Sequence, residues 1–429
     1  MLKAGFSRVD ITPPLGTRLE GYFEIRHMKG ILDPLYLNAL ALSDGEKTVL
    51  LITADVLQIR KNYADEIKAF ISEKTGVDKN NIELTALHQH TSFGVRDLDS
   101  YNAVKDKNFM ETLYRKFADV SAMAIEDMAE TTAETAEKET SEQLSFIRRY
   151  VMNDGTVMTY PESRRSEIVR PCRESDNTVR LVRFKREKGD IALVNFSTHP
   201  DVIHGEYVSA DWPGFVRAFV EKDIEGTRCI CTVGAQGDSN HMEFMAKEYK
   251  DGYEHSKRMG RVIADTVISM WNNTEKRDTS TLSAHAETMF IRTRTDGEEQ
   301  YEEMKKLLAD YNAGTYTGRK LNITDLGSAT RIVNLKTATL YQQIPVTVIN
   351  LGEIGIAGYG GEPFTKYADA LRKAFPERFI ITCCCMNGGE GYLPTKEAFH
   401  EIGYEAGSSP FSENLEEKCV NAAIEMLNR

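Results

Sequence analysis

The segment Ile82-Glu83-Leu84-Thr85-Ala86-Leu87 is an apolar run of strand length, and it leads directly into His88-Gln89-His90. Short runs rich in Val, Ile, Leu, Cys and Thr are typical of buried strands. Further runs of this kind occur at residues 48–57, 191–196, 228–233, 346–349 and 379–385. Between many of them lie amphipathic, helix-like stretches, at residues 63–74, 109–128, 214–222, 253–271, 364–375 and 414–427. This alternation predicts an α/β fold in which mixed β-sheets are flanked by helices.

Polar residues of metal-binding type follow the ends of the predicted strands. In chain order, the strands lead to His88 and His90, to His199, to Asp238 and Asn240, to Glu362, and to Tyr392. Ligands of α/β proteins bind at the carboxyl ends of strands, so we expect these tips to form one crevice. Imidazole nitrogens and carboxylate oxygens suit zinc, and a catalytic zinc site keeps one position open for water.

Each motif also has a simpler interpretation. A His-x-His pair such as His88 and His90 is more often two hydrogen-bonded histidines in a loop, and only its companions favour a metal site. Glu362 precedes Pro363 and a predicted helix, so a carboxylate stabilised by the helix dipole explains it equally well. The Gly-rich loop at residues 234–241 lacks the Lys-Ser/Thr pair of a phosphate-binding loop, and the sequence has no Gly-x-Ser-x-Gly nucleophile elbow.

The composition excludes several classes of partner. The 429 residues are 41% hydrophobic and 28% charged, which is ordinary for a globular protein with a sizeable core. The formal net charge of -12 repels phosphate backbones, so we expect no nucleic-acid partner and weak binding to anionic membranes. The sequence has no apolar run of roughly 18–20 residues and no signal peptide at its start, so we expect a cytoplasmic protein without a transmembrane segment.

The chain shows no internal sequence repeat and no Gly/Ser linker, so we expect one catalytic domain over residues 1–429. Residues from about 273 to 343 are less apolar and form a possible peripheral insertion or sheet, with a charged, solvated helix at residues 298–311. The seven cysteines lack zinc-ribbon spacing. Three of them, at residues 383–385, are expected to act as small apolar residues of a buried strand.

Together, these motifs resemble those of the neutral/alkaline ceramidase family, in its N-terminal catalytic domain. The similar segments follow the family order along nearly the whole chain. They are Ala4–Pro14, Thr53–Asp55, Thr85–His90, Asn195–Pro200, Gly361–Thr365 and Gly391–Thr395.

The resemblance implies one zinc ion per chain, held by His88, His199, Glu362 and Tyr392. It also implies that His90 faces the substrate and that an arginine, matched by Arg148 or by its neighbour Arg149, positions the substrate carbonyl.

Two departures from the family pattern weigh against ceramide itself as the substrate. Without a gap, Asn240 stands where the family has a serine at the reaction centre, and Ser239 lies one place earlier. The family also carries a further C-terminal β domain, for which this chain leaves no room. The metal ligands are less affected by either departure.

The predicted reaction is hydrolysis of an N-acyl amide, in a small or lipid-like substrate, by metal-activated water. Asp238 is expected to orient its loop or a neighbouring histidine, and Asn240 to hydrogen-bond the leaving group. His204 and His241 are expected at the pocket rim or in structural hydrogen bonds. Two alternatives stay open: a metal-dependent hydrolase of an ester or carbohydrate derivative, and a non-catalytic binding protein. Zinc cannot be separated from manganese or iron by ligand type, and the oligomeric state stays open.

Overall fold

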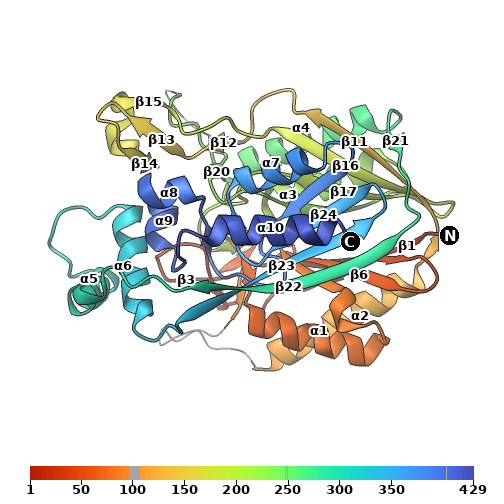
Figure 1. Cartoon of the computed structure of the whole chain (residues 1–429), viewed down its shortest axis with the longest axis horizontal. Helices are drawn as coiled ribbons and strands as arrows, with labels where there is room; N and C mark the ends of the chain where they lie inside the picture. Colours follow the sequence, from red (N-terminus) through yellow and green to blue (C-terminus); the bar gives the residue numbers. More distant parts are fainter. Residues whose placement is uncertain (97–106, 247, 249, 402) are drawn as a thin grey trace.

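Three sheets of four or five strands dominate the part of the chain that the computed structural model describes, residues 1–96, 107–246, 248, 250–401 and 403–429 (Figure 1). The first sheet has the order β10-β1-β5-β6-β8. Its strands are β1 (Lys3–Asp10), β5 (Tyr36–Ser43), β6 (Thr48–Ala54), β8 (Ile82–Ala86) and β10 (Ala129–Glu130).

The other two sheets repeat this arrangement. The second has the order β19-β17-β16-β11-β21, with β11 (Thr132–Glu139), β16 (Thr178–Lys185), β17 (Ile191–Phe196), β19 (Arg228–Val233) and β21 (Glu275–Lys276). The third has the order β22-β23-β24-β26, with β22 (Leu282–Arg292), β23 (Tyr341–Leu351), β24 (Ile354–Tyr359) and β26 (Phe379–Cys383). Each sheet is antiparallel except for one parallel pair at its edge, β6–β8, β17–β19 or β24–β26.

A helix connects the two strands of each parallel pair, because parallel strands need a crossover. These helices are α1 (Lys61–Thr75), α3 (Asp211–Asp223) and α7 (Thr365–Ala374). Three further helices, α2 (Lys107–Glu126), α4 (Gly252–Met270) and α10 (Leu415–Leu427), contact the same three sheets in turn. The helices thus form an outer layer around the sheets (Figure 1). The predicted α/β class with helix-flanked mixed sheets is confirmed.

The inner faces of the three sheets share one apolar core. Each sheet contributes fully or nearly fully buried side chains to it, including Leu40 and Leu51, Val182 and Ile230, and Ile349 and Ile381. Hydrogen bonds also join the sheets where their parallel strands end. Ala86 donates its N–H to the carbonyl of Cys385 at 3.2 Å, and Cys384 donates to that of Val233 at 2.9 Å. The loops that follow these strands therefore meet at one place.

Shorter elements complete the fold. Between β22 and β23, which pair along their whole length, lie α5 (Tyr301–Asn312) and α6 (Ile323–Leu335). The segment at 273–343 therefore contains the edge strand β22 of the third sheet as well as these two helices. The remaining elements used below are β2 (Arg18–Leu19), β3 (Arg26–His27), β12 (Phe146–Ile147), β18 (Tyr207–Val208), β20 (Ser239–Asn240), β25 (Glu362–Pro363), β27 (Tyr392–Leu393) and α9 (Tyr404–Ser408). Among the described residues, no helix combines the length and apolar character that crossing a bilayer requires.

Candidate active site

His88 follows β8 in a backbone conformation that non-glycine residues rarely adopt, with φ of 69°. Its N–H donates to the carbonyl of Val56 at 3.0 Å, and its ring Nδ1 lies 2.8 Å from the carbonyl oxygen of Leu57. Because a carbonyl only accepts, Nδ1 carries the proton and Nε2 presents a lone pair. That Nε2 lies 3.2 Å from Oε2 of Glu362.

His199, after β17, is fixed in the same way. Its Nδ1 lies 2.8 Å from the carbonyl oxygen of Gln236 and 3.0 Å from that of Ser239. Its Nε2 lies 3.0 Å from the same Oε2 of Glu362. Two imidazole lone pairs and one carboxylate therefore converge on a single point.

Glu362 lies in β25, which pairs in parallel with β27 and places Glu362 opposite Tyr392. The carboxylate is buried, which alone would raise its pKa, but His88 and His199 lower that pKa well below its ordinary value. Burial lowers the pKa of His88, yet Glu362 and Cys385 together outweigh it and raise that pKa well above the ordinary value. Without a metal ion, the two Nε2 atoms and the carboxylate oxygen can satisfy one another only by sharing protons. A bound divalent cation would satisfy all three at once.

His90 completes the histidine group but differs from the other two. One nitrogen from each of the three rings lies within 4.8 Å of the others. Among the described residues, neither ring nitrogen of His90 has a hydrogen-bond partner, although its side chain is only 7% exposed. Burial lowers its pKa well below the ordinary value, so the ring is neutral.

Tyr392 lies beside the histidines, with its ring centroid 6.3 Å from that of His199. Burial raises the pKa of its hydroxyl well above the ordinary value, although Arg148 opposes this. Its ring packs edge-on against Tyr404 of α9, at 5.3 Å, and the guanidinium carbon of Arg148 lies 5.1 Å from its ring centroid. The phenol is therefore held from two sides.

Arg148 lies against Tyr392 and is 2% exposed. Its Nε donates to Glu405 at 2.7 Å, Nη2 to the carbonyl of Gly237 at 2.9 Å and Nη1 to the hydroxyl of Tyr160 at 3.1 Å. Arg149 instead donates to Glu401 at 3.1 Å. Of the two arginines, Arg148 is the one in contact with the tyrosine of the site.

Asp238 and Asn240 support the loop between β19 and β20. The Asp238 carboxylate accepts from the N–H of Thr365, at 2.7 Å, and from its hydroxyl, at 3.2 Å. It therefore caps α7, which begins at Thr365 and not at Pro363, and Glu362 stays free of the helix terminus. Asn240 donates its side-chain amide to Asp201 at 2.8 Å and to Tyr160, and its side-chain oxygen accepts from the N–H of Met242.

Several residues of the site gave no sequence signal. Tyr404 and Glu405 come from a five-residue helix, and Tyr22 from a short hairpin. For Glu405 there is one general argument: a buried arginine needs a carboxylate partner. Glu405 is that partner for Arg148. His204 lies at the rim, with a 40% exposed side chain, while His241 is buried 3.4 Å from Asp201.

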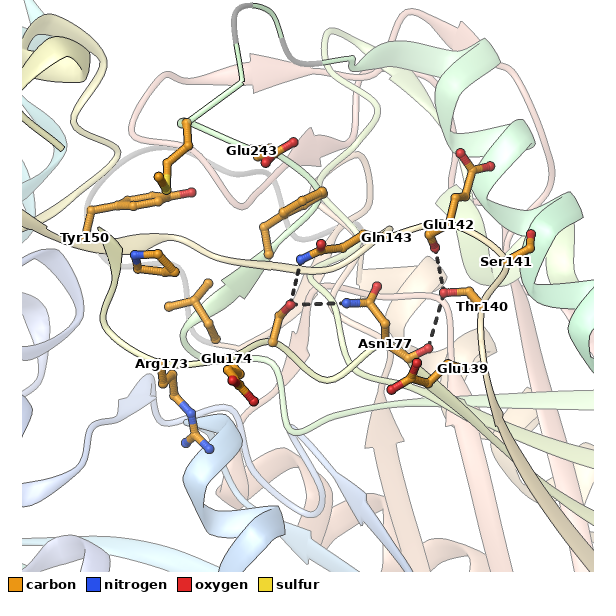
Figure 2. A pocket seen from close by; sticks show the side chains of 15 residues that line it. Glu139, Thr140, Ser141, Glu142, Gln143, Tyr150, Arg173, Glu174, Asn177 and Glu243 are labelled. Atoms are coloured by element: carbon orange, nitrogen blue, oxygen red, sulfur yellow. Dashed lines mark hydrogen bonds between the residues drawn. The ribbon is translucent and has the colours of Figure 1, made fainter. Parts of the chain in front are cut away.

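A cavity of about 650 Å³ lies beside the β12–β20 ribbon but contains none of the candidate site residues (Figure 2). Phe146 and Ile147 of β12 line it together with Tyr150. Gln143 and Asn177 brace another wall by donating to the hydroxyl of Ser175, at 2.9 and 3.1 Å. This cavity is therefore separate from the histidine group.

Comparisons with known proteins identify the family of the chain and structures of similar fold. Residues 2–322 match the family model described as neutral/alkaline non-lysosomal ceramidase, N-terminal. The fold is similar to that of the neutral ceramidase from Pseudomonas aeruginosa, with a TM-score of 0.73 and 13% identity over 99% of this chain and 74% of that one. It is also similar to a ceramidase complexed with C2, with a TM-score of 0.72 and 14% identity over the same shares. No curated protein matches the sequence. The chain belongs to the neutral/alkaline non-lysosomal ceramidase family.

Proposed function

We propose that this protein is a zinc-dependent hydrolase that cleaves N-acyl amide bonds. The observation that carries the proposal is the convergence of His88 Nε2 and His199 Nε2 on one carboxylate oxygen of Glu362, at 3.2 and 3.0 Å. Both imidazoles are oriented by backbone carbonyls at Nδ1, as metal-binding histidines usually are. Tyr392, opposite Glu362 in the β25–β27 pair, is the proposed fourth ligand.

The choice between Glu362 and His90 as the third ligand rests on their surroundings. Glu362 Oε2 lies within 3.2 Å of Nε2 of both His88 and His199. His90 has no hydrogen bond that would fix its ring as a ligand, among the described residues. We therefore assign His90 to the substrate side of the site.

When bound, zinc lowers the pKa of a coordinated water to roughly 7 and polarises a carbonyl oxygen. The protein's own groups supply the remaining steps. A neutral His90, with no hydrogen bond at either nitrogen among the described residues, would take up the proton that the attacking water loses and deliver it to the leaving amine as the C–N bond breaks. The Arg148 guanidinium carbon lies 5.1 Å from the Tyr392 ring centroid and holds that ring in place. The Tyr392 hydroxyl would shift during turnover from metal ligand to donor for the developing oxyanion.

The substrate class follows from the family and from these contacts. Ceramidases cleave the amide of a lipid, so we assign this protein an N-acyl amine with an apolar acyl group. Asn240 uses its amide N–H groups on Asp201 and Tyr160, so we assign it to supporting the loop and not to binding the leaving group. The amine part of the substrate stays to be identified with a substrate panel.

The decisive experiment is elemental analysis of the purified protein beside Glu362→Ala and a control, Glu377→Ala, whose side chain is exposed. We expect about one zinc per chain in wild type and control, and loss of zinc in Glu362→Ala. The loaded protein is then assayed on matched N-acyl amides and esters. Absence of metal from all three proteins, even after zinc is supplied, contradicts the proposal; ester cleavage without amide cleavage corrects the substrate class.

A further inference from the structure

The β2–β3 hairpin packs directly on His90. A Cβ atom placed on Gly21, whose φ is 103°, would lie 2.7 Å from Cγ of His90. The neighbouring ring of Tyr22 meets the His90 ring edge-on, with centroids 5.0 Å apart. Only glycine allows the hairpin to approach so closely in this conformation. The hairpin is therefore a wall of the site, in contact with its least restrained histidine.

Arg26 ties this wall to the rest of the site. It is 7% exposed, and its guanidinium donates to three backbone carbonyls at 2.8 Å each, those of Glu20, His90 and Gly205. The same guanidinium carbon lies 4.3 Å from the ring centroid of Tyr22. The planar fork of arginine suits such a junction, because its donors point in fixed directions. Arg26 thus fixes the backbone of His90 and the ring of Tyr22 together.

The hydroxyl of Tyr22 has two further contacts, with the carbonyl of Asp201 at 3.5 Å and with His204. This hydroxyl lies 2.7 Å from Nδ1 of His204, whose side chain is 40% exposed. The hydroxyl therefore anchors the far end of the ring, while the ring edge contacts His90. Substitution of Tyr22 by phenylalanine removes the hydroxyl contact with His204 and keeps the ring contact with His90, so the two contacts can be tested separately.

We propose that Tyr22 is the positioning residue of His90, with the β2–β3 hairpin as its support. Within the described part of the chain, the His90 ring has no hydrogen bond to set its orientation, so its packing contacts determine where its nitrogens point. The rings around it are those of His88, His199 and Tyr22, with centroids at 5.1, 5.7 and 5.0 Å. His88 and His199 are the proposed zinc ligands. Tyr22 is therefore the ring that contacts His90 from the substrate side.

The first test measures the exposure of His90 and does not depend on turnover or metal. Diethyl pyrocarbonate acylates neutral imidazoles, and peptide mass spectrometry locates each product. We expect several-fold faster labelling of His90 in Tyr22→Leu, and wild-type rates in Tyr22→Phe and in the control Tyr207→Leu. Labelling of His400, whose side chain is 67% exposed, serves as the internal reference. Equal His90 labelling in Tyr22→Leu and wild type overturns the proposal, as does faster labelling in Tyr22→Phe or in Tyr207→Leu.

The second test rests on the proposed function and uses zinc-loaded protein. We expect Tyr22→Leu to keep its zinc and its KM while kcat falls about tenfold, a part of the roughly 10²–10⁴-fold that a positioned acid–base group contributes. Tyr22→Phe should restore kcat. A change confined to KM, or loss of zinc, overturns the positioning role. If wild type itself has no activity, the labelling result still decides the contact, and only the hydrolase proposal fails.

Discussion

Glu83 provides a quantitative test of the structure through the pH dependence of stability. It lies fully buried on β8, where burial raises the pKa of its carboxyl from 4.5 to about 6, while Lys68 and Asn387 oppose the rise. The folded protein therefore holds this proton more tightly than the unfolded chain. The resulting stability is fully present below pH 4.5 and is lost as the pH rises through about 6.

The size of the effect follows from the two pKa values. At roughly 1.4 kcal/mol per pKa unit, the step from 4.5 to about 6 costs about 2 kcal/mol of unfolding free energy. Urea unfolding of metal-free protein between pH 4.5 and 7 measures it. Because glutamine is neutral throughout, Glu83→Gln should lack this loss, whereas the exposed control Glu73→Gln should retain it. If Glu83→Gln and wild type lose the same free energy over this range, Glu83 does not have the raised pKa that its burial requires.

Three further predictions concern the site. His88→Ala or His199→Ala should abolish zinc binding and activity, whereas His90→Ala should lose activity and keep most of the zinc, as measured by elemental analysis. If His90→Ala instead loses the zinc and His88→Ala keeps it, the roles of His88 and His90 are exchanged. Arg148→Met should lower the unfolding free energy by about 3–5 kcal/mol, because it leaves the Glu405 carboxylate buried without its closest charged partner, and adding Glu405→Gln should recover part of the loss in urea melts. Free zinc at about 100 times its dissociation constant should stabilise the protein by about 2.7 kcal/mol, and a chelator should reverse this; an unchanged melting temperature counts against zinc binding at the proposed site.

The fold class and the meeting place of the loops could be predicted from local patterns. The strand at residues 82–86 and those preceding His199 and Asp238 are buried on both faces, so their apolar runs are continuous and easily recognised. The antiparallel strands β11 and β22 carry many polar or partly exposed residues, and their sequences resemble loops. The three sheets share one topology, but their sequences show no repeat. This arrangement could therefore not be predicted from the sequence.

The supporting residues of the site could not be predicted, because their roles exist only in the folded chain. Asp238 follows a strand, as a catalytic residue would, yet it caps a helix that begins far along the sequence, at Thr365. Tyr404 and Tyr22 lie in short irregular segments, where neither periodicity nor a motif distinguishes them. Their contacts with Tyr392 and His90 depend on how separate segments pack, and a single sequence does not encode that in any local pattern.

Each of the three sheets contributes a loop to the candidate site, and this affects when during protein synthesis a metal ion could bind. At roughly 5–20 residues per second, a ribosome needs about 15–60 s to synthesise the stretch from His88 to Tyr392. Throughout that time the nascent chain offers only fragments of the candidate ligand set, each a weak chelator. A metal ion at the proposed site would therefore bind after translation, to a chain whose sheets have already packed. Selection among the cellular metals would then depend on the geometry of the folded site, and not on whichever ion the emerging polypeptide meets first.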